Sequence, residues 1–212
     1  MRNFKKTLSF LLSTVIIVSS VAGVGTTVFA ATDEHTYKNF KYRILDDNTA
    51  EICGYTGKNA VVTVPDSIDS KPVTSIGRTA FYSGKIKEVK IPNTVKNIKW
   101  WAFYGCESLE KINLNFGLKT VGYGAFMNCK NLKSVSIPMS VTQICDDSFA
   151  VSCSTKKGVF DTYSKQTIST QQYSTDSSFT LEGYSGTVAE KYCNDNSLNF
   201  VSLGNVIYGD VN

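Results

Sequence analysis

A unit of about 23 residues recurs through the middle of the chain, and this repeat limits the folds open to the sequence more than any other feature. Ile91–Asn113 and Leu114–Ser136 align without gaps, a further copy starts at Ile137, and a less regular copy covers Val64–Lys90. Each copy carries a phenylalanine directly after a small residue, at Phe81, Phe103, Phe126 and Phe149. Such repetition is typical of solenoids, in which each unit buries its apolar side only against its neighbours.

Alternation of apolar and polar residues predicts one short parallel strand in each unit. Val89, Ile112 and Val135 occupy equivalent positions and are expected to point into the core. The polar residues beside them are expected to point outward: Glu88, Lys90, Lys111, Asn113, Ser134 and Ser136. Because a solenoid exposes one face of its sheet, these side chains form the default binding surface as a group, although solvated sheet is the favoured explanation for each one alone.

The repeat follows the motif Leu-x-x-Val-x-Ile-Pro-x-x-Val-x-x-Ile-Gly-x-x-Ala-Phe-x-x-Cys over residues 64–153. In this motif the sequence resembles the BspA-like (treponemal-type) leucine-rich repeat family. The resemblance implies a curved solenoid with a parallel sheet on one face, in secreted or surface proteins whose repeats bind or adhere and carry no catalytic residues. Three residues depart from the motif, since Lys99 and Cys145 replace a glycine and Ser148 replaces an alanine.

The segments around the repeats predict caps for the open ends of the core. In residues 40–63, alternating residues before and after a turn predict an antiparallel hairpin. For residues 154–178 we predict either a polar insertion or a degenerate repeat. The pattern of residues 179–204 predicts a strand, a short helix with a Thr187–Glu190 capping box, and a last strand. The expected fold is a mainly β (α+β) repeat solenoid: a short, curved leucine-rich-repeat stack with a parallel sheet, an N-terminal hairpin cap and a C-terminal strand–helix–strand cap.

The first 30 residues have the composition of a targeting sequence. A cationic start, an apolar run and Val28-Phe29-Ala30 predict a secretory signal peptide cleaved after Ala30, followed by a flexible lead-in over residues 31–39. The alternative is a membrane anchor, but Ser, Gly and Thr interrupt the apolar run. The whole chain has 22 Lys+Arg and 18 Asp+Glu, and removing the three basic residues of the leader leaves 22 − 3 = 19, or a net charge of +1. We therefore expect a secreted or surface protein with no nucleic-acid partner and no membrane span after cleavage.

The single histidine, His35, makes most enzyme chemistries improbable. One imidazole cannot build a multi-histidine zinc site, and a residue in a flexible lead-in cannot be held against a nucleophile. Asp146 and Asp147 are adjacent, and nothing pairs them with a second carboxylate at the separation a glycosidase needs. We expect no enzymatic activity and no resident cofactor.

The six cysteines permit disulfides in an exported chain, but their connectivity does not follow from sequence. Cys106 and Cys129 are equivalent residues one coil apart, at a strand spacing of about 4.8 Å that a bridge tolerates. Their side chains should point in parallel, which favours two buried free thiols. Cys145 and Cys153 flank the last phenylalanine of the repeats and form a second candidate pair.

Four aromatic residues are further candidates for ligand binding: Trp100, Trp101, Tyr104 and Tyr123. Trp100 and Tyr123 share a repeat position that should face solvent, so their rings are expected to stack one coil apart. Flat aromatic surfaces suit sugar rings and protein partners alike. The alternative is that they shield the coil or contact the insertion. The expected ligand is therefore a protein or a glycan.

For residues 205–212 we predict a linker. It ends in Gly209-Asp210-Val211-Asn212, a tetrapeptide that resembles the opening of a dockerin. In that module Asp210 and Asn212 would be calcium ligands, and the partner would be a cohesin of a cellulosome scaffold. The later ligand positions of the loop fall beyond Asn212, so this sequence cannot hold calcium, and a frayed terminus is the plain alternative. We interpret the chain as a secreted, non-catalytic binding protein; the alternatives are a scaffold-tethered accessory module and a non-catalytic fragment of a larger secreted enzyme.

Overall fold

The computed structural model describes most of the chain after its first segment, in residues 34–149, 152–161, 166–174 and 178–205, with side chains described outside 150–177. The elements described below all belong to one unit, within residues 32–212. The predicted signal peptide and the dockerin-like tetrapeptide lie outside the described residues. No helix in the described ranges is both long and apolar enough to cross a membrane.

The predicted parallel strands are present as β7 (Glu88–Lys90), β9 (Lys111–Asn113) and β11 (Ser134–Ser136). A fourth strand, β4 (Val61–Thr63), was not predicted: its residues were assigned to the hairpin cap, but they pair with β7 in parallel. β4, β7 and β9 pair in register, so that Val62, Val89 and Ile112 lie side by side. β11 lies next to β9. In every one of these strands the middle residue is buried and its neighbours are exposed or half-buried. The alternation read from the sequence is therefore confirmed.

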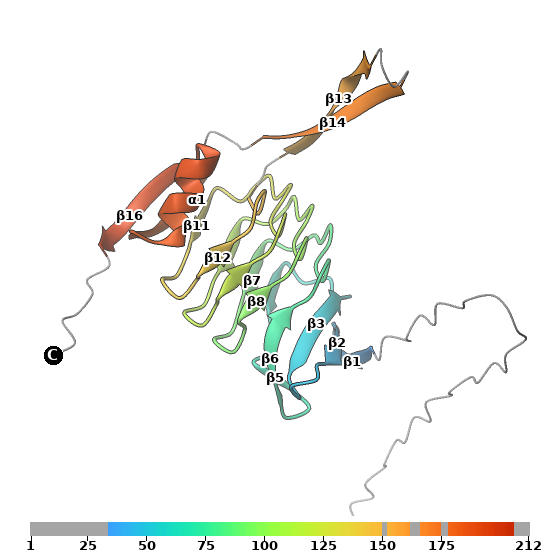
Figure 1. The fold of residues 1–212 in the computed structure, drawn as a ribbon. Helices are drawn as coiled ribbons and strands as arrows, with labels where there is room; N and C mark the ends of the chain where they lie inside the picture. Colours follow the sequence, from blue (N-terminus) through green and yellow to red (C-terminus); the bar gives the residue numbers. More distant parts are fainter. Residues whose placement is uncertain (1–33, 150–151, 162–165, 175–177, 206–212) are drawn as a thin grey trace, which may run out of the picture. The chain divides into compact units, whose positions relative to one another are not determined.

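A second, larger sheet joins the predicted hairpin to strands of the coils that the sequence did not predict. Its strands are β1 (His35–Tyr37), β2 (Phe40–Ile44), β3 (Ala50–Tyr55), β5 (Ser67–Ile68), β6 (Lys71–Ile76), β8 (Asn97–Ile98), β10 (Thr120–Val121) and β12 (Gln143–Ile144). Along the path β3, β6, β8, β10 and β12 neighbouring strands are parallel, and Figure 1 shows successive coils contributing adjacent strands. β5 lies off this path and pairs with β6 antiparallel. β8, β10 and β12 are too short for a period of two to be recognised, which is why the sequence did not predict them.

A column of stacked aromatic rings runs through the core. Phe81, Phe103, Phe126 and Phe149 follow one another with ring centroids 4.8, 5.2 and 5.2 Å apart and nearly parallel planes. Phe179 continues the column at 5.6 Å from Phe149. Each coil thus adds one ring to a shared core, and each stacked pair contributes about 0.5–1.5 kcal/mol beyond the burial of its area.

The N-terminal cap is the predicted antiparallel hairpin, formed by β2 and β3. β3 also pairs with β6 in parallel, which joins the hairpin to the first coil. The prediction of a flexible lead-in is wrong for residues 35–37, because β1 adds to the edge of the hairpin and pairs with β2. Three residues are too few to show a strand pattern, and the free backbone edge of β2 supplies the partner that orders them.

The C-terminal cap consists of β15 (Thr180–Ser185), α1 (Val188–Asn196) and β16 (Asn199–Asn205), as predicted. β11 pairs with β15 and β15 with β16, all in parallel. The capping box is wrong in detail. The Thr187 hydroxyl donates to the carbonyl of Tyr184, and Glu190 Oε2 accepts from the backbone N–H of Gly186 at 2.7 Å. The turn at Gly186 (φ +81°) presents its own N–H to the carboxylate in place of that of Thr187.

Residues 154–178, expected to be an insertion or a degenerate repeat, contain most of two antiparallel strands, β13 (Ser152–Asp161) and β14 (Gln166–Ser174). Within the described part of the chain these two strands form a sheet of their own. The chain on either side of them continues the solenoid, because β11 precedes the hairpin and its parallel neighbour β15 follows it. Along the chain, the hairpin therefore lies between two strands that pair with each other, and it is not part of their sheet.

Candidate binding surfaces

The outward residues of β7, β9 and β11 form one polar row on the surface. Register places Glu88 opposite Lys111 and Lys90 opposite Asn113. Glu88 is half-buried and the other five predicted residues are exposed: Lys90, Lys111, Asn113, Ser134 and Ser136. Lys90 Nζ lies 3.9 Å from a Glu88 carboxylate oxygen, and the Ser136 hydroxyl donates to Glu182 of β15. The structure therefore brings all six predicted side chains onto one face, with both signs of charge close together.

The predicted pairing of Trp100 with Tyr123 is wrong. Tyr123 contacts the edge of Trp101, with centroids 6.2 Å apart, and the guanidinium of Arg78 lies 4.8 Å from the Trp101 ring. Trp101 has a left-handed backbone (φ +56°), and its indole packs on Gly124, where an added Cβ would lie 2.7 Å from it. The left-handed turn is the physical reason, because it directs Trp101 rather than Trp100 toward the next coil. Trp100 itself is 58% exposed.

Tyr104 belongs to a second aromatic pair whose other member the repeat analysis missed. Tyr82 stacks on Tyr104 with centroids 5.3 Å apart and planes 6° from parallel. Tyr104 is fixed on the side of the next coil, since its hydroxyl accepts from Asn128 Nδ2 at 3.1 Å. Each tyrosine follows a core phenylalanine by one residue, so the 22-residue spacing of Phe81 and Phe103 contained the signal for this pair.

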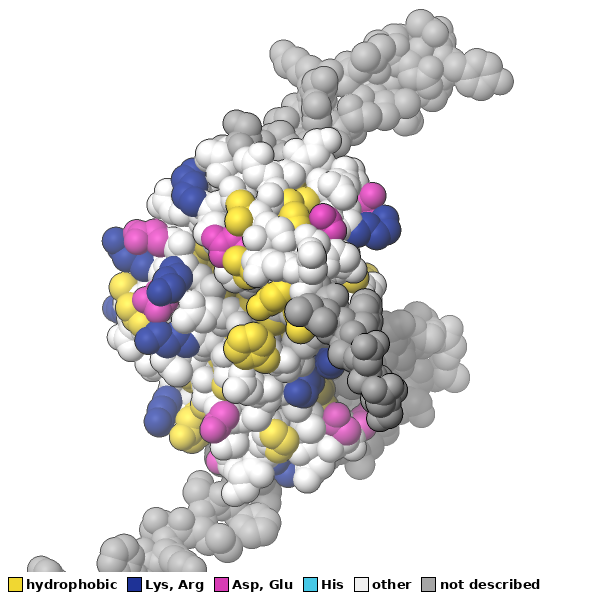
Figure 2. Space-filling model, turned by 90° about the vertical axis from the view of Figure 1, so that its left-hand side faces the viewer, with side chains coloured by type: hydrophobic (Ala, Val, Ile, Leu, Met, Phe, Trp, Pro, Cys, Tyr) yellow, Lys and Arg dark blue, Asp and Glu magenta, His cyan; other side chains and the backbone are white. Residues whose placement is uncertain are grey.

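Phe116 and Met139 are exposed apolar residues that had no predicted role. Phe116 is 82% exposed and Met139 53%. They occupy equivalent turn positions in successive units, where the preceding copy has Asn93. Figure 2 shows exposed hydrophobic side chains of this kind in small groups, interspersed with Lys, Arg, Asp and Glu, on the face that it presents. Scattered exposure of this sort is common on proteins and does not by itself define a site.

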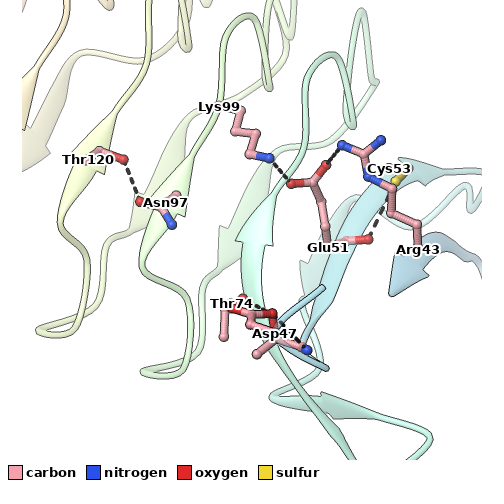
Figure 3. A network of polar contacts seen from close by, with 9 residues as sticks. Arg43, Asp47, Glu51, Cys53, Thr74, Asn97, Lys99 and Thr120 are labelled. Carbon is pink, nitrogen blue, oxygen red and sulfur yellow. Dashed lines mark hydrogen bonds and ion pairs between the residues drawn. The ribbon is translucent and has the colours of Figure 1, made fainter. Parts of the chain in front are cut away.

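A buried carboxylate explains one departure from the repeat motif. Glu51 is 1% exposed; its Oε1 lies 2.6 Å from Arg43 Nη2 and its Oε2 pairs with Lys99 Nζ (Figure 3). Lys99 stands where the motif has glycine, and Gly77 occupies that position in the intervening coil. A Cβ on Gly77 would approach Glu51 Oε1 to 3.0 Å, so the glycine leaves room for the carboxylate. The attraction of Glu51 raises the pKa of the Arg43 guanidinium above its ordinary value.

The thiols of Cys106 and Cys129 form the predicted ladder and no bridge. Each donates to the carbonyl of a phenylalanine one coil earlier: Cys106 Sγ to Phe81 at 2.9 Å and Cys129 Sγ to Phe103 at 3.2 Å. Burial raises the pKa of the Cys106 thiol to about 11 and holds that of the Cys129 thiol well above its ordinary value. Cys145 is a free thiol, and the side chain of its candidate partner Cys153 lies outside the described residues.

The residues considered for catalysis lie on different elements, because His35 belongs to β1 whereas Asp146 and Asp147 follow β12. His35 is exposed on β1, with its ring 5.4 Å from that of Tyr42. Burial raises the pKa of the Asp147 carboxyl, whose hydrogen bond from Tyr123 acts in the opposite direction. Within the described ranges no three His, Cys, Asp or Glu side chains are grouped so that they could hold a metal ion. Asp210 and Asn212 lie outside those ranges, so the calcium prediction stays a prediction.

Comparison with known families agrees with the repeated strand, turn and phenylalanine column. The family model of the BspA type leucine rich repeat region matches six copies over residues 62–180, which is more than half of the chain. The chain belongs to this family. The match begins within β4 and ends at the first residue of β15, so it includes every coil of the leucine-rich repeat stack.

Solved leucine-rich repeat structures resemble this one in part. A leucine-rich repeat protein from Bacteroides capillosus is 30% identical, with a TM-score of 0.51 over 53% of this chain and 88% of that one. The Treponema pallidum leucine rich repeat protein is 29% identical (TM-score 0.47, 55% and 66%). A leucine rich cell surface protein from Faecalibacterium prausnitzii is 26% identical (TM-score 0.48, 73% and 46%). The chain thus spans less than two thirds of the length of the Treponema pallidum and Faecalibacterium prausnitzii proteins. Comparison with curated proteins gives no match.

Proposed function

We propose that this chain is an exported, non-catalytic binding protein that binds a protein partner. The partner would contact the polar row of β7, β9 and β11 together with the neighbouring strand β4. The observation that carries the proposal is the row of outward side chains, repeated from strand to strand in register. In-register pairing fixes the spacing of these side chains before a partner arrives, which lowers the ordering cost of association. A rigid row that repeats across coils is suited to an extended contact rather than to a small molecule.

The charges of the row favour a protein over a polyanion. Glu88 lies opposite Lys111, and the adjoining turns pair Lys87 with Glu110 at 3.2 Å. A surface that mixes both signs complements a protein surface that also carries both, and it repels partners whose pattern is reversed. Export is supported by the composition of residues 1–30, and a binding role is supported by membership of the leucine-rich repeat family.

The test compares two charge reversals on the full chain. Lys111→Glu alters the middle of the row, whereas Lys119→Glu alters an exposed lysine next to β10 of the other sheet. Binding to a panel of purified extracellular proteins is measured by biolayer interferometry. We expect Lys111→Glu to weaken any saturable binding at least fivefold and Lys119→Glu to leave it unchanged.

Two results would contradict the proposal. In the first, binding is lost equally in the two variants, which indicates general electrostatic attraction. In the second, binding survives Lys111→Glu and also survives reversal of Glu88, which places the contact elsewhere on the molecule. Circular dichroism of each variant shows that the fold is retained, as expected for side chains on a solvated strand face.

A further inference from the structure

A pocket lies where the hairpin cap meets the turn of the first coil. Its volume is about 340 Å³, and its walls come from Glu34, from Lys41 of β2, and from residues 53–59, 79–82 and 84–86. This volume lies at the lower end of the range for small-molecule sites, about 300–1,000 Å³. The pocket is separate from the polar row of β7, β9 and β11, since none of the six residues of that row lines it.

Tyr82 supplies a flat aromatic wall. Its side chain lines the pocket and is 56% exposed. Tyr104 from the next coil covers one face of the ring, and Asn128 in turn holds Tyr104 through its hydroxyl. Among the described residues Tyr104 is the only ring that stacks on Tyr82, and the exposure of the Tyr82 side chain leaves its other face for a ligand. A ring held in this way is a preformed platform rather than a mobile surface side chain.

The charge of the pocket is positive. Lys41, Lys58 and Lys85 line it together with one acidic residue, Glu34, which gives 3 − 1 = +2. These three lysines make no ion pair within the described part of the chain, unlike Lys87, Lys90, Lys99, Lys130 and Lys191, which each face a carboxylate. Cys53 also lines the pocket, and burial raises its pKa to about 11, so the thiol adds no negative charge at neutral pH.

We propose that this pocket binds an anionic oligosaccharide of the uronic-acid type, with one sugar ring stacked on the open face of Tyr82 and carboxylates held by Lys41, Lys58 and Lys85. A sugar ring presents C–H groups to an aromatic face while its carboxylate and hydroxyls remain at its edge, where the lysines lie. A neighbouring depression of about 370 Å³ shares Gly84 and Lys85 with the pocket and is lined by Tyr104. Two adjoining depressions along a row of tyrosines suit a linear chain of sugar units.

The test titrates tetragalacturonic acid into the full-length protein by isothermal titration calorimetry. We expect Tyr82→Ala to weaken binding roughly 2- to 10-fold, in proportion to the loss of one aromatic contact, and Tyr82→Phe to preserve it. The double variant Lys58→Ala/Lys85→Ala should weaken binding further, and raising the salt concentration should weaken binding to the parent protein. Phe116→Ala and Lys87→Ala are the matched controls, an exposed aromatic and an exposed lysine outside the pocket.

Three results would overturn the assignment. Binding of the methyl-esterified tetrasaccharide with equal affinity would remove the anionic requirement. Tighter binding of a tetraglutamate peptide would identify an acidic peptide site instead. Absence of tetragalacturonate binding, or equal loss in Tyr82→Ala and Phe116→Ala, would remove the role of the pocket. None of these results affects the polar row, whose proposed partner and variants are different.

Discussion

Lys99 shows how one residue that breaks a repeat motif can hold two parts of the molecule together. It pairs with Glu51 of the hairpin cap, across the coil that contains Gly77. Arg43 approaches the same carboxylate from β2. A carboxylate with 2% side-chain exposure is costly to leave without a counter-charge, so the two half-exposed cations share the task of neutralising it.

This sharing predicts a non-additive effect on the free energy of unfolding. Arg43→Met and Lys99→Met should each cost about 1–2 kcal/mol, because the other cation remains, while the double variant should cost about 3–5 kcal/mol. Urea unfolding of the four proteins measures the coupling, and Lys87→Met, which breaks an exposed pair, should change stability by less than about 0.5 kcal/mol. Strict additivity, or no recovery when Glu51→Gln is added to the double variant, would show that the buried charge is not the cause.

Among the structural elements, the turns after β6, β8, β10 and β12 share a left-handed backbone conformation that their different amino acids do not reveal. Thr79, Trp101, Gly124 and Asp147 occupy equivalent positions, and all four have φ between +52° and +56°. Only glycine adopts this region without strain, and a non-glycine residue there costs about 1–2 kcal/mol. The side chains at this position therefore persist because they make contacts, as Trp101 does on Gly124.

Opposite effects on stability are expected from two substitutions at this turn position. Thr79→Gly should raise the free energy of unfolding by about 0.5–1 kcal/mol, since relief of strain exceeds the added entropy of the unfolded chain. Gly124→Ala should lower it by about 1–3 kcal/mol, because the new Cβ meets the Trp101 indole at a strained φ. Thermal and urea unfolding measure both. Equal signs for the two changes would contradict the shared backbone.

The same comparison of elements shows what the sequence could and could not predict. β7, β9 and β11 were predictable because three alternating residues recur at a fixed spacing, and their six outward side chains were predictable with them. The larger sheet was not, since β8, β10 and β12 have two residues each. The pocket beside Tyr82 depends on how Lys41 and Tyr55 of the cap meet the first turn, and such long-range contacts leave no local pattern.

For the molecule as a whole, buried weak acids predict a loss of stability in alkali. The folded state raises the pKa of the Cys106 thiol from 9.0 to about 11 and that of the Tyr192 hydroxyl from 10.0 to about 12, mainly through burial. The unfolded chain releases these protons first. The stabilising effect is therefore complete below pH 9 and declines by up to about 1.4 kcal/mol per pH unit for each group as the pH passes through the folded pKa values.

Unfolding measured from pH 8 to 12 tests this dependence. Cys106→Ala should flatten the decline from pH 9 onward, whereas Tyr192→Phe should flatten it only above pH 10. Both variants lose some packing in the core, so the slope against pH and not the stability itself is the informative quantity. A free energy of unfolding that stays constant or rises across this range would refute the assignment.

The hairpin of β13 and β14 has a consequence for what the solenoid can carry. Phe149 and Phe179 stack at 5.6 Å and β11 pairs with β15, although residues 150–178 separate the two rings along the chain. The stack closes across this point whatever the length of chain between, because the cost of closing a loop grows only slowly with its length. This junction is therefore a position where the hairpin can be replaced by a foreign peptide or a small folded domain. The solenoid would display the insert, because its strand register is set on either side of the junction.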